Sequence, residues 1–95
     1  MLFSDKIRQL REEKQLLQRQ LASALEVDTP MYSKIERGDR SAKREQVLII
    51  AKILSVNENE LLILWLADKI LGEVEAETEL ADKALKIAQQ NLKHK

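Results

Sequence analysis

The chain has 95 residues, 44% of them hydrophobic, with one Phe, one Trp and one Tyr, and its formal net charge is zero. It has no Cys, which excludes disulfides and thiolate metal sites, and its single His, His94, has no ligand partner nearby in the sequence. The longest apolar run, 61–67, is far shorter than the roughly 20 residues that a membrane-spanning helix needs, and the charged segment 4–13 does not resemble a signal peptide. We therefore expect a soluble cytoplasmic protein of one domain, with no cofactor and no metal.

The pattern of breaks and apolar residues predicts an all-α fold. Two Gly and one Pro leave few interruptions, and no stretch alternates apolar and polar residues over many positions. We predict helices over about 4–14, 18–25, 29–37, 44–54, 58–71 and 78–92. The Glu-rich segment 73–79 is either a loop or a bent continuation of a helix. The expected aliphatic core comprises Phe3, Ile7, Leu10, Leu21, Ala22, Leu25, Val27, Tyr32, Ile35, Val47, Leu48, Ile50, Ala51 and Leu54.

Residues at the expected helix ends favour these boundaries. Ser4 is placed to cap the first helix and Asp28 the third, where Pro30 lies in the first turn and its missing N–H is not needed. Gly38 follows the third helix, as a left-handed C-terminal glycine does.

The boundaries of the fifth helix are predicted from two further signals. Asn57 and Glu60 have the spacing of a capping box at its start. Gly72 is expected to end it.

Residues 18–38 carry the clearest functional pattern in the chain. They predict two short helices joined by a tight turn, with the small residue Ala22 where the helices cross and the apolar residues Leu21 and Leu25 facing inward. The outward positions of the second helix are mostly polar. This is the pattern of a helix-turn-helix, which places its second helix in the DNA major groove.

Over residues 3–66 the chain resembles the lambda-repressor-like, Cro-type helix-turn-helix regulators, often called the XRE family. The resemblance implies an all-α, five-helix lambda-repressor-like DNA-binding domain, here with an additional C-terminal helix. It rests on Arg11, Gln18-Arg19-Gln20-Leu21-Ala22, Val27, Tyr32-Ser33-Lys34-Ile35-Glu36-Arg37-Gly38, Ile50-Ala51-Lys52-Ile53-Leu54-Ser55-Val56 and Glu60-Leu61-Leu62.

The resemblance implies a set of contacts with double-stranded DNA. Gln18, at the start of the second helix, is expected to hold a phosphate. Major-groove contacts are expected from Thr29, Pro30, Met31, Ser33 and Lys34. Lys34 can donate to guanine, whereas Pro30 and Met31 can touch thymine methyl groups. Phosphate contacts are expected from Arg37, Arg40, Lys43 and Arg44.

The charge distribution is polarised along the chain. Residues 1–55 carry 11 Lys/Arg against 8 Asp/Glu, a net of +3, and residues 56–95 carry 5 against 8, a net of −3. Five of the bases fall within 33–44, with two acids. This basic strip fits a local nucleic-acid footprint, although a solvated charged surface would give the same imbalance.

Two charged residues of the motif are expected to pair, and two other residues depart from the family's usual pattern. The resemblance implies a structural ion pair between Arg11 and Glu36 that joins the first and third helices; the alternative is two surface charges. Glu26 stands where the family usually has Gly, in a turn that often needs a positive φ, so either its backbone is strained or the turn has a different shape. Tyr32 replaces the usual Ile or Val, so its hydroxyl needs a partner or an exposed edge.

Residues 73–95 are predicted to be a C-terminal extension of the domain at 1–72. Their apolar stripe either packs back on the domain or joins two subunits. We favour a homodimer, since palindromic DNA presents half-sites about 34 Å apart to a two-fold protein. We interpret Trp65, in the apolar run before the extension, as a core or dimer-interface anchor. The stripe consists of Val74, Leu80, Ala81, Ala84, Leu85, Ala88 and Leu92.

The predicted function is sequence-specific transcription regulation, and not catalysis, because the chain has no Cys, no His pair and no Gly-rich phosphate loop. Resemblance to short regulators suggests a restriction–modification or phage-type controller. The alternative is an antitoxin or a protein–protein interaction module with the same fold.

Overall fold

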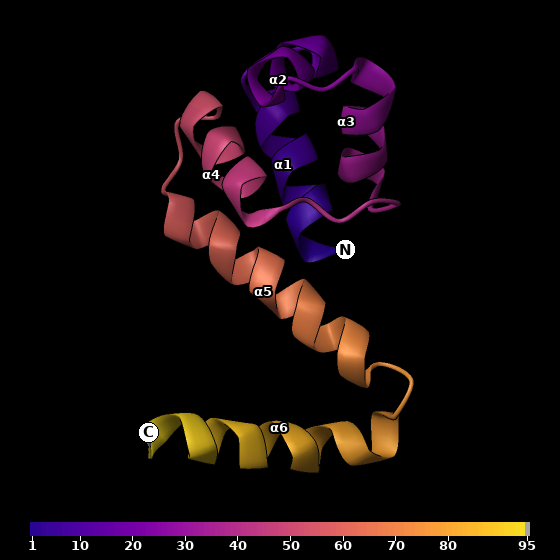
Figure 1. Ribbon diagram of the computed structural model, residues 1–95, viewed down its shortest axis with the longest axis vertical. Helices are drawn as coiled ribbons and strands as arrows, with labels where there is room; N and C mark the ends of the chain where they lie inside the picture. The colour runs from indigo at the N-terminus through magenta and orange to yellow at the C-terminus, as the bar shows by residue number, and fades with distance from the viewer. Residues whose placement is uncertain (95) are drawn as a thin grey trace.

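In a computed structural model that describes residues 1–94, the chain is built from six helices, with no strand within that range (Figure 1). The helices are α1 (Leu2–Glu13), α2 (Gln18–Leu25), α3 (Thr29–Arg37), α4 (Arg44–Ile53), α5 (Glu58–Val74) and α6 (Thr78–Lys93). The all-α prediction is confirmed, and each predicted helix is present with its ends shifted by no more than a few residues.

The first four helices and the start of α5 enclose one aliphatic core. Figure 1 shows α1 to α4 gathered at one end of the molecule, with α5 running away from them and α6 turning back beneath it. Most of the expected core is buried, joined by Ala42, Leu61 and Leu62, while Leu10, Val27 and Leu48 are only partly buried at its edge. Burial of this apolar surface is the main force that holds α1–α5 together.

The start of α1 differs from the prediction. Ser4 lies inside the helix, is buried, and its hydroxyl donates to the Met1 carbonyl at 3.3 Å, so the prediction that Ser4 caps α1 is wrong. The backbone N–H groups of Leu2 and Phe3 donate instead to the two carboxylate oxygens of Asp68, each at 2.9 Å. A carboxylate of α5 therefore caps α1 and ties the two helices together.

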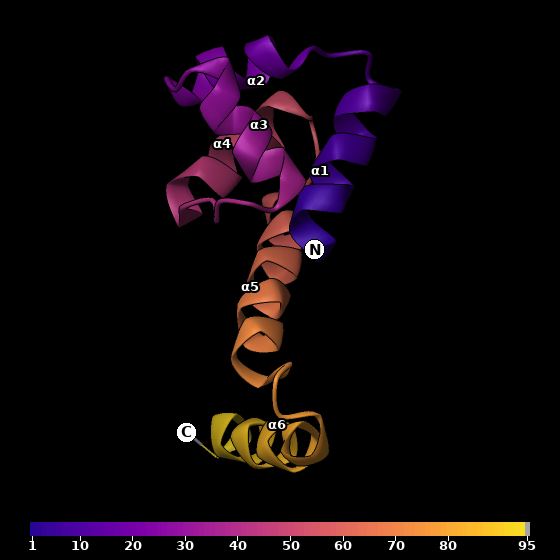
Figure 2. The same cartoon turned by 90° about the vertical axis from the view of Figure 1, so that its right-hand side faces the viewer.

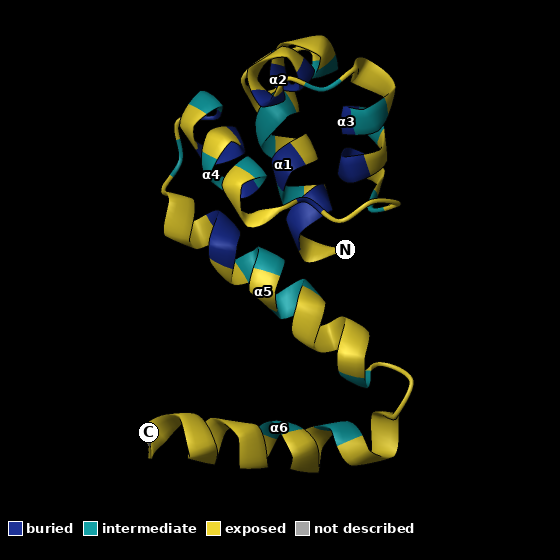
Figure 3. Cartoon of the chain, viewed as in Figure 1, coloured by how far each residue is buried: buried dark blue, intermediate teal, exposed yellow. Residues whose placement is uncertain are grey.

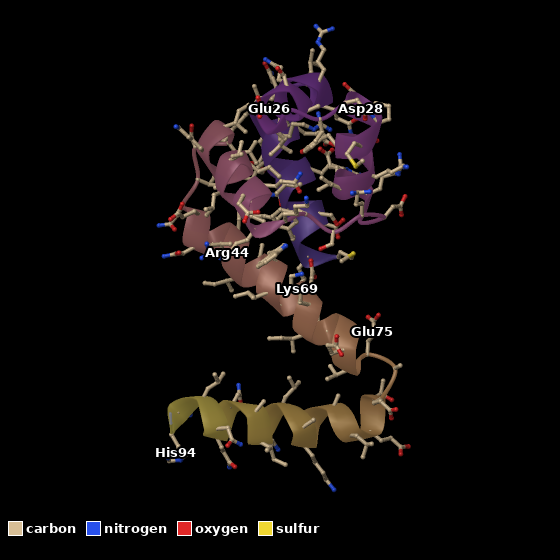
Figure 4. All side chains as sticks on the ribbon, in the orientation of Figure 1. Glu26, Asp28, Arg44, Lys69, Glu75 and His94 are labelled. Atoms are coloured by element: carbon tan, nitrogen blue, oxygen red, sulfur yellow. The ribbon has the colours of Figure 1, made fainter. Side chains whose placement is uncertain are left out.

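The turn between α2 and α3 is tight and has a left-handed residue. Glu26 has φ 59° and ψ 39°, which confirms the expected positive φ. Asp28 then caps α3, because its Oδ1 accepts a hydrogen bond from the Met31 N–H at 2.8 Å. Figure 4 labels Glu26 and Asp28 on either side of this turn. Gly38, with φ 81°, ends α3 as predicted.

Helix α5 also departs from the prediction at both ends. Asn57 precedes it, but its side chain accepts from the Asn59 N–H at 2.8 Å and no capping box with Glu60 is formed. The prediction that Gly72 ends the helix is wrong: α5 continues through Gly72 to Val74. Gly72 does not adopt a positive φ, so it lowers helix propensity there without terminating the helix.

Helix α6 stands apart from the core. None of its residues is buried, and Leu80, Ile87 and Leu92 are 60%, 60% and 71% exposed. Figure 3 shows its surface as almost entirely exposed, with partly buried patches on the side toward α5. The apolar stripe of the C-terminal extension therefore has little cover within one copy of the chain. No helix in the described residues is both long and apolar enough to cross a membrane.

The left-handed residue in the turn gives a testable prediction. Replacing Glu26 by Gly should raise the free energy of unfolding by about 0.5–1 kcal/mol, because relief of a left-handed Cβ, about 1–2 kcal/mol, exceeds the added unfolded-state entropy of Gly, about 0.4–1 kcal/mol. Urea denaturation measures the change. The Glu26→Ala variant also loses the charge but keeps the Cβ, so it is the control. Equal stability of the Gly and Ala variants would contradict the assigned strain.

Candidate nucleic-acid interface

Helix α3 lies on the outside of the domain, held against α2 from behind. Figure 2 looks onto α3, with α2 above it. Ala22 on α2 is buried and permits the close approach of the two helices, and Tyr32 and Ile35 turn the inner face of α3 to the core. These contacts leave the opposite face of α3 in solvent, as a helix that enters a DNA groove requires.

The outward face of α3 carries the predicted base-contacting residues. Thr29, Pro30 and Lys34 are exposed, and Met31 and Ser33 are partly buried. Thr29 and Pro30 form the first turn after the Asp28 cap, the part of a recognition helix that usually reaches deepest. The face thus combines one cation, two hydroxyl groups and two apolar groups.

Arg37 is already paired at the end of α3. Its Nη1 donates to the Ser33 hydroxyl at 3.0 Å, and its Nε forms an ion pair with the Asp39 carboxylate at 3.1 Å. Both partners are polar groups near the end of α3, so the guanidinium is oriented along the helix surface. Asp39 compensates part of the local positive charge.

The remaining predicted phosphate contacts lie in and after the segment 38–43, which joins α3 to α4. Arg40 and Lys43 are exposed within this segment. Arg44, the first residue of α4, is also exposed but lines a hollow with Asn59 and Leu62 of α5. Figure 4 labels Arg44 at the start of α4, beside α5. Arg40 therefore lies just after the end of α3, whereas Lys43 and Arg44 lie at the start of α4.

Gln18 is the first residue of α2 and bonds to α3. Its Nε2 donates to Glu36 Oε1 at 3.3 Å. The amide nitrogen has a second N–H, so this bond leaves a donor for a phosphate at the α2 N-terminus. Sequence analysis did not foresee the contact with Glu36.

Behind the helix pair, Arg11 and Glu36 form a bidentate ion pair. Arg11 Nη2 and Nε approach Glu36 Oε1 and Oε2 at 2.8 and 2.9 Å, and the side chain of Glu36 is only 1% exposed. Arg11 Nη1 also donates to the Leu16 carbonyl at 2.9 Å, in the connection between α1 and α2. One guanidinium thus fixes α1, that connection and α3 to one another.

The pKa shifts follow from this cluster. Burial alone would raise the pKa of Glu36, but the hydrogen bonds, chiefly from Arg11, outweigh it and hold the pKa below its usual range. The hydrogen bond to Glu36 raises the pKa of Arg11. Burial raises the pKa of Tyr32 far above its usual range, and the nearby Glu36 carboxylate adds to that shift. The Tyr32 hydroxyl is buried without reaching hydrogen-bond geometry to any group in residues 1–94.

Two glutamines organise the starts of helices near this surface, and sequence analysis overlooked both. Gln20 Oε1 accepts from the Leu17 N–H at 2.7 Å, and Gln46 Oε1 accepts from the Lys43 N–H at 2.8 Å. Each Gln stands three residues after the residue that precedes its helix, which is one half of a capping box. That spacing was the available signal.

This geometry, two crossed helices with an exposed polar second helix, defines a helix-turn-helix protein. The sequence model of the family described as Helix-turn-helix matches residues 7–61. The chain belongs to this family, the XRE or lambda-repressor-like group of DNA-binding transcriptional regulators. Comparisons with curated proteins and with solved structures gave no significant match. Within residues 1–94, no group of three His, Cys, Asp or Glu side chains is arranged to hold a metal ion.

The buried ion pair gives the next prediction. At neutral pH, Arg11→Met should lower the free energy of unfolding by about 3–5 kcal/mol, because it leaves the Glu36 carboxylate buried without its partner. The loss should shrink as the pH falls. In the wild type the lowered pKa of Glu36 means that its stabilising contribution is lost as pH falls through that pKa, whereas in the variant the carboxylate protonates at a higher pH and is relieved.

Arg8→Met is the matched control for this experiment. Arg8 is in the same helix and pairs with Glu12, but both side chains are mostly exposed, so its loss should be at most about 0.5 kcal/mol. Urea unfolding of both variants at neutral pH and near pH 4 measures the effect. A loss for Arg11→Met that equals the control, or that grows in acid, would contradict the account.

Proposed function

We propose that the protein is a sequence-specific regulator that inserts α3 into the DNA major groove and acts as a homodimer on a palindromic operator. The observation that carries this proposal is the exposed outer face of α3, held over a buried ion pair in a chain of a DNA-binding family. The lack of any catalytic arrangement in the sequence agrees with a role in binding. Such a regulator would work in the cytoplasm, where its DNA is.

Base and phosphate contacts have separate candidates. Lys34, Thr29 and Ser33 supply hydrogen-bonding groups for base edges, and Pro30 and Met31 supply apolar contact with thymine methyls. Arg40 and Lys43 are exposed cations in the segment after α3, where they would neutralise phosphates without reading sequence. Gln18 would add a phosphate contact at the start of α2. Arg37 would have to give up its ion pair with Asp39 in order to bind a phosphate. Arg44 would contact only those DNA phosphates that lie near α5.

A second copy of the chain is the proposed cover for the apolar faces of α5 and α6. On α5, Ile63, Leu66 and Ile70 are exposed and recur at three- and four-residue intervals, so they share one side of the helix. On α6, Leu80 of the apolar stripe is exposed, and so is Ile87, which lies two turns further along beside it. Exposed apolar side chains that gather on one side of a helix favour an interaction site there. Because α5 crosses residue 72, we place the division between domain and extension at the turn 75–77.

A controller role in a restriction–modification or phage system fits a short regulator of this family and remains part of the proposal. The alternative is an antitoxin or other interaction module, in which the same apolar faces would bind an unrelated protein.

The DNA-binding role predicts different effects on DNA affinity for one lysine variant and one arginine variant. On DNA from upstream of the protein's own coding sequence, Lys34→Ala should weaken binding by about 1–3 kcal/mol and reduce discrimination against scrambled DNA. Arg40→Ala should weaken binding to both DNAs by the same factor. It should also reduce the magnitude of the slope of log affinity against log salt concentration by about 0.9. Fluorescence anisotropy over a salt series measures both effects.

Lys93→Ala is the control, since it removes one exposed charge from the polar side of α6 and should leave affinity and slope unchanged. Binding that is absent, or insensitive to salt, would favour the interaction-module alternative.

The homodimer proposal predicts that an acidic substitution at an exposed apolar residue of α6 weakens association. Sedimentation equilibrium should show a dimer for the wild type, and Ile87→Asp should raise the dissociation constant at least about ten-fold, because a buried unpaired charge costs more than 1.4 kcal/mol. Gln90→Asp, on the polar side of α6, makes a similar charge change and should remain dimeric. An unchanged dimer in Ile87→Asp would refute the role of α6.

A further inference from the structure

The segment 38–43 is attached to the rest of the domain through one side chain of α5. The indole N–H of Trp65 donates to the Ala42 carbonyl at 2.8 Å, across 23 residues of sequence. Ala42 is buried, 5% exposed. Helix α5 is thus hydrogen-bonded to the segment at Ala42, one residue before Lys43 and two residues after Arg40.

Other hydrogen bonds hold this segment only at its ends. At the start, the N–H groups of Asp39 and Arg40 donate to the Lys34 carbonyl, at 2.9 and 3.2 Å. At the end, the Lys43 N–H donates a hydrogen bond to Gln46 Oε1. Within residues 1–94, the bond from Trp65 is the one hydrogen bond that joins the middle of the segment to another helix.

Packing beneath the segment is incomplete. A cavity of about 150 Å³ lies there, lined by Gly38, Arg40, Ser41, Ala42 and Trp65 among others. Atoms that line such a space lack packing partners on that side, so packing alone holds the segment less firmly than it would in a filled core. The indole hydrogen bond adds a directed contact there.

The ring of Trp65 is itself fixed. Lys69 Nζ, one turn further along α5, lies 4.5 Å from the ring centroid, and the ring packs against the core. Figure 4 shows Lys69 where α5 passes beneath the start of α1. Since Leu61 and Leu62 are buried in the core and Asp68 accepts hydrogen bonds from the first amides of α1, α5 is anchored on both sides of Trp65.

We infer that Trp65 is a positioning residue for DNA binding: its indole N–H sets the place of the segment 38–43, so that Arg40 and Lys43 meet DNA phosphates together. This inference rests on the proposed function, because it assumes that these cations contact DNA. It assigns Trp65 a role that lies outside the recognition helix and is separate from sequence reading. Base contacts from α3 do not depend on it.

The Trp65→Phe variant tests the inference with little change in packing. Phe keeps an aromatic face for the core and for Lys69 but removes the N–H. Affinity for the upstream DNA and for scrambled DNA should fall alike, by about 3- to 10-fold, the worth of one neutral hydrogen bond. The slope of log affinity against log salt should fall by roughly 1, as for a lost phosphate contact. Discrimination between the two DNAs should stay within about two-fold.

Two controls separate positioning from loss of stability. Ile53→Ala removes partly buried apolar surface at the far end of α4; it should lower the free energy of unfolding without changing the salt slope. In an Arg40→Ala background, Trp65→Phe should have a smaller effect than in the wild type, since both changes act on the same contact.

The outcomes distinguish this inference from the proposed function. Wild-type binding with an unchanged salt slope in Trp65→Phe, or full additivity with Arg40→Ala, would overturn the inference alone. If the wild-type protein bound neither DNA, the proposed function would fall and the inference with it.

Discussion

The arrangement of the DNA-binding surface depends on the ion pair between Arg11 and Glu36. Glu36 is nearly the last residue of α3, so its side chain marks where the recognition helix lies relative to α1. Two nitrogens of the Arg11 guanidinium donate hydrogen bonds to the Glu36 carboxylate, and the third donates to the Leu16 carbonyl. A buried pair of this kind adds little net stability over apolar residues of the same size, but it accepts few alternative geometries. Its contribution is to define the position of α3.

Around that pair, the domain divides its tasks among elements. The core holds α1–α4 together, the outer face of α3 is left free, and the segment 38–43 carries cations beside it. Helix α5 touches two of these parts, through Asp68 at the start of α1 and Trp65 at Ala42. Its opposite side carries the exposed apolar residues that we propose for subunit contact. On this account, one helix joins the proposed dimer interface to the proposed phosphate contacts, so association and DNA binding would support each other.

Much of this was predictable from the sequence because the signals are local. The helical period, Asp28 as a cap and Gly38 in a left-handed conformation each depend on residues within one or two turns, and each is confirmed. The predictions that failed also used local signals, but there a distant group intervened or the signal was weak. Ser4 is not the cap of α1 because Asp68, more than sixty residues away, takes that role. Gly72 does not end α5 because a glycine only permits a helix to stop.

The candidate site shows the same limit. The identity and exposure of the α3 face were predictable from a single helical period. The hydrogen bond from Trp65 to Ala42 was not predictable, since a bond between an indole N–H and a loop carbonyl produces no recognisable spacing of residues in the sequence. Likewise, a phosphate contact was predicted for Gln18 from the family resemblance, whereas its hydrogen bond to Glu36 depends on how α2 and α3 pack together.

The central claim is that α3 reads base sequence as one half of a two-fold protein. Selection of bound sequences from a random DNA pool tests it most directly, because one measurement yields the site, its symmetry and the spacing of its halves. The account predicts an enriched palindrome whose half-sites are centred about one helical turn, roughly 34 Å, or a multiple of it, apart. A pool with no enriched motif, or with a single asymmetric site bound by one copy, would contradict it.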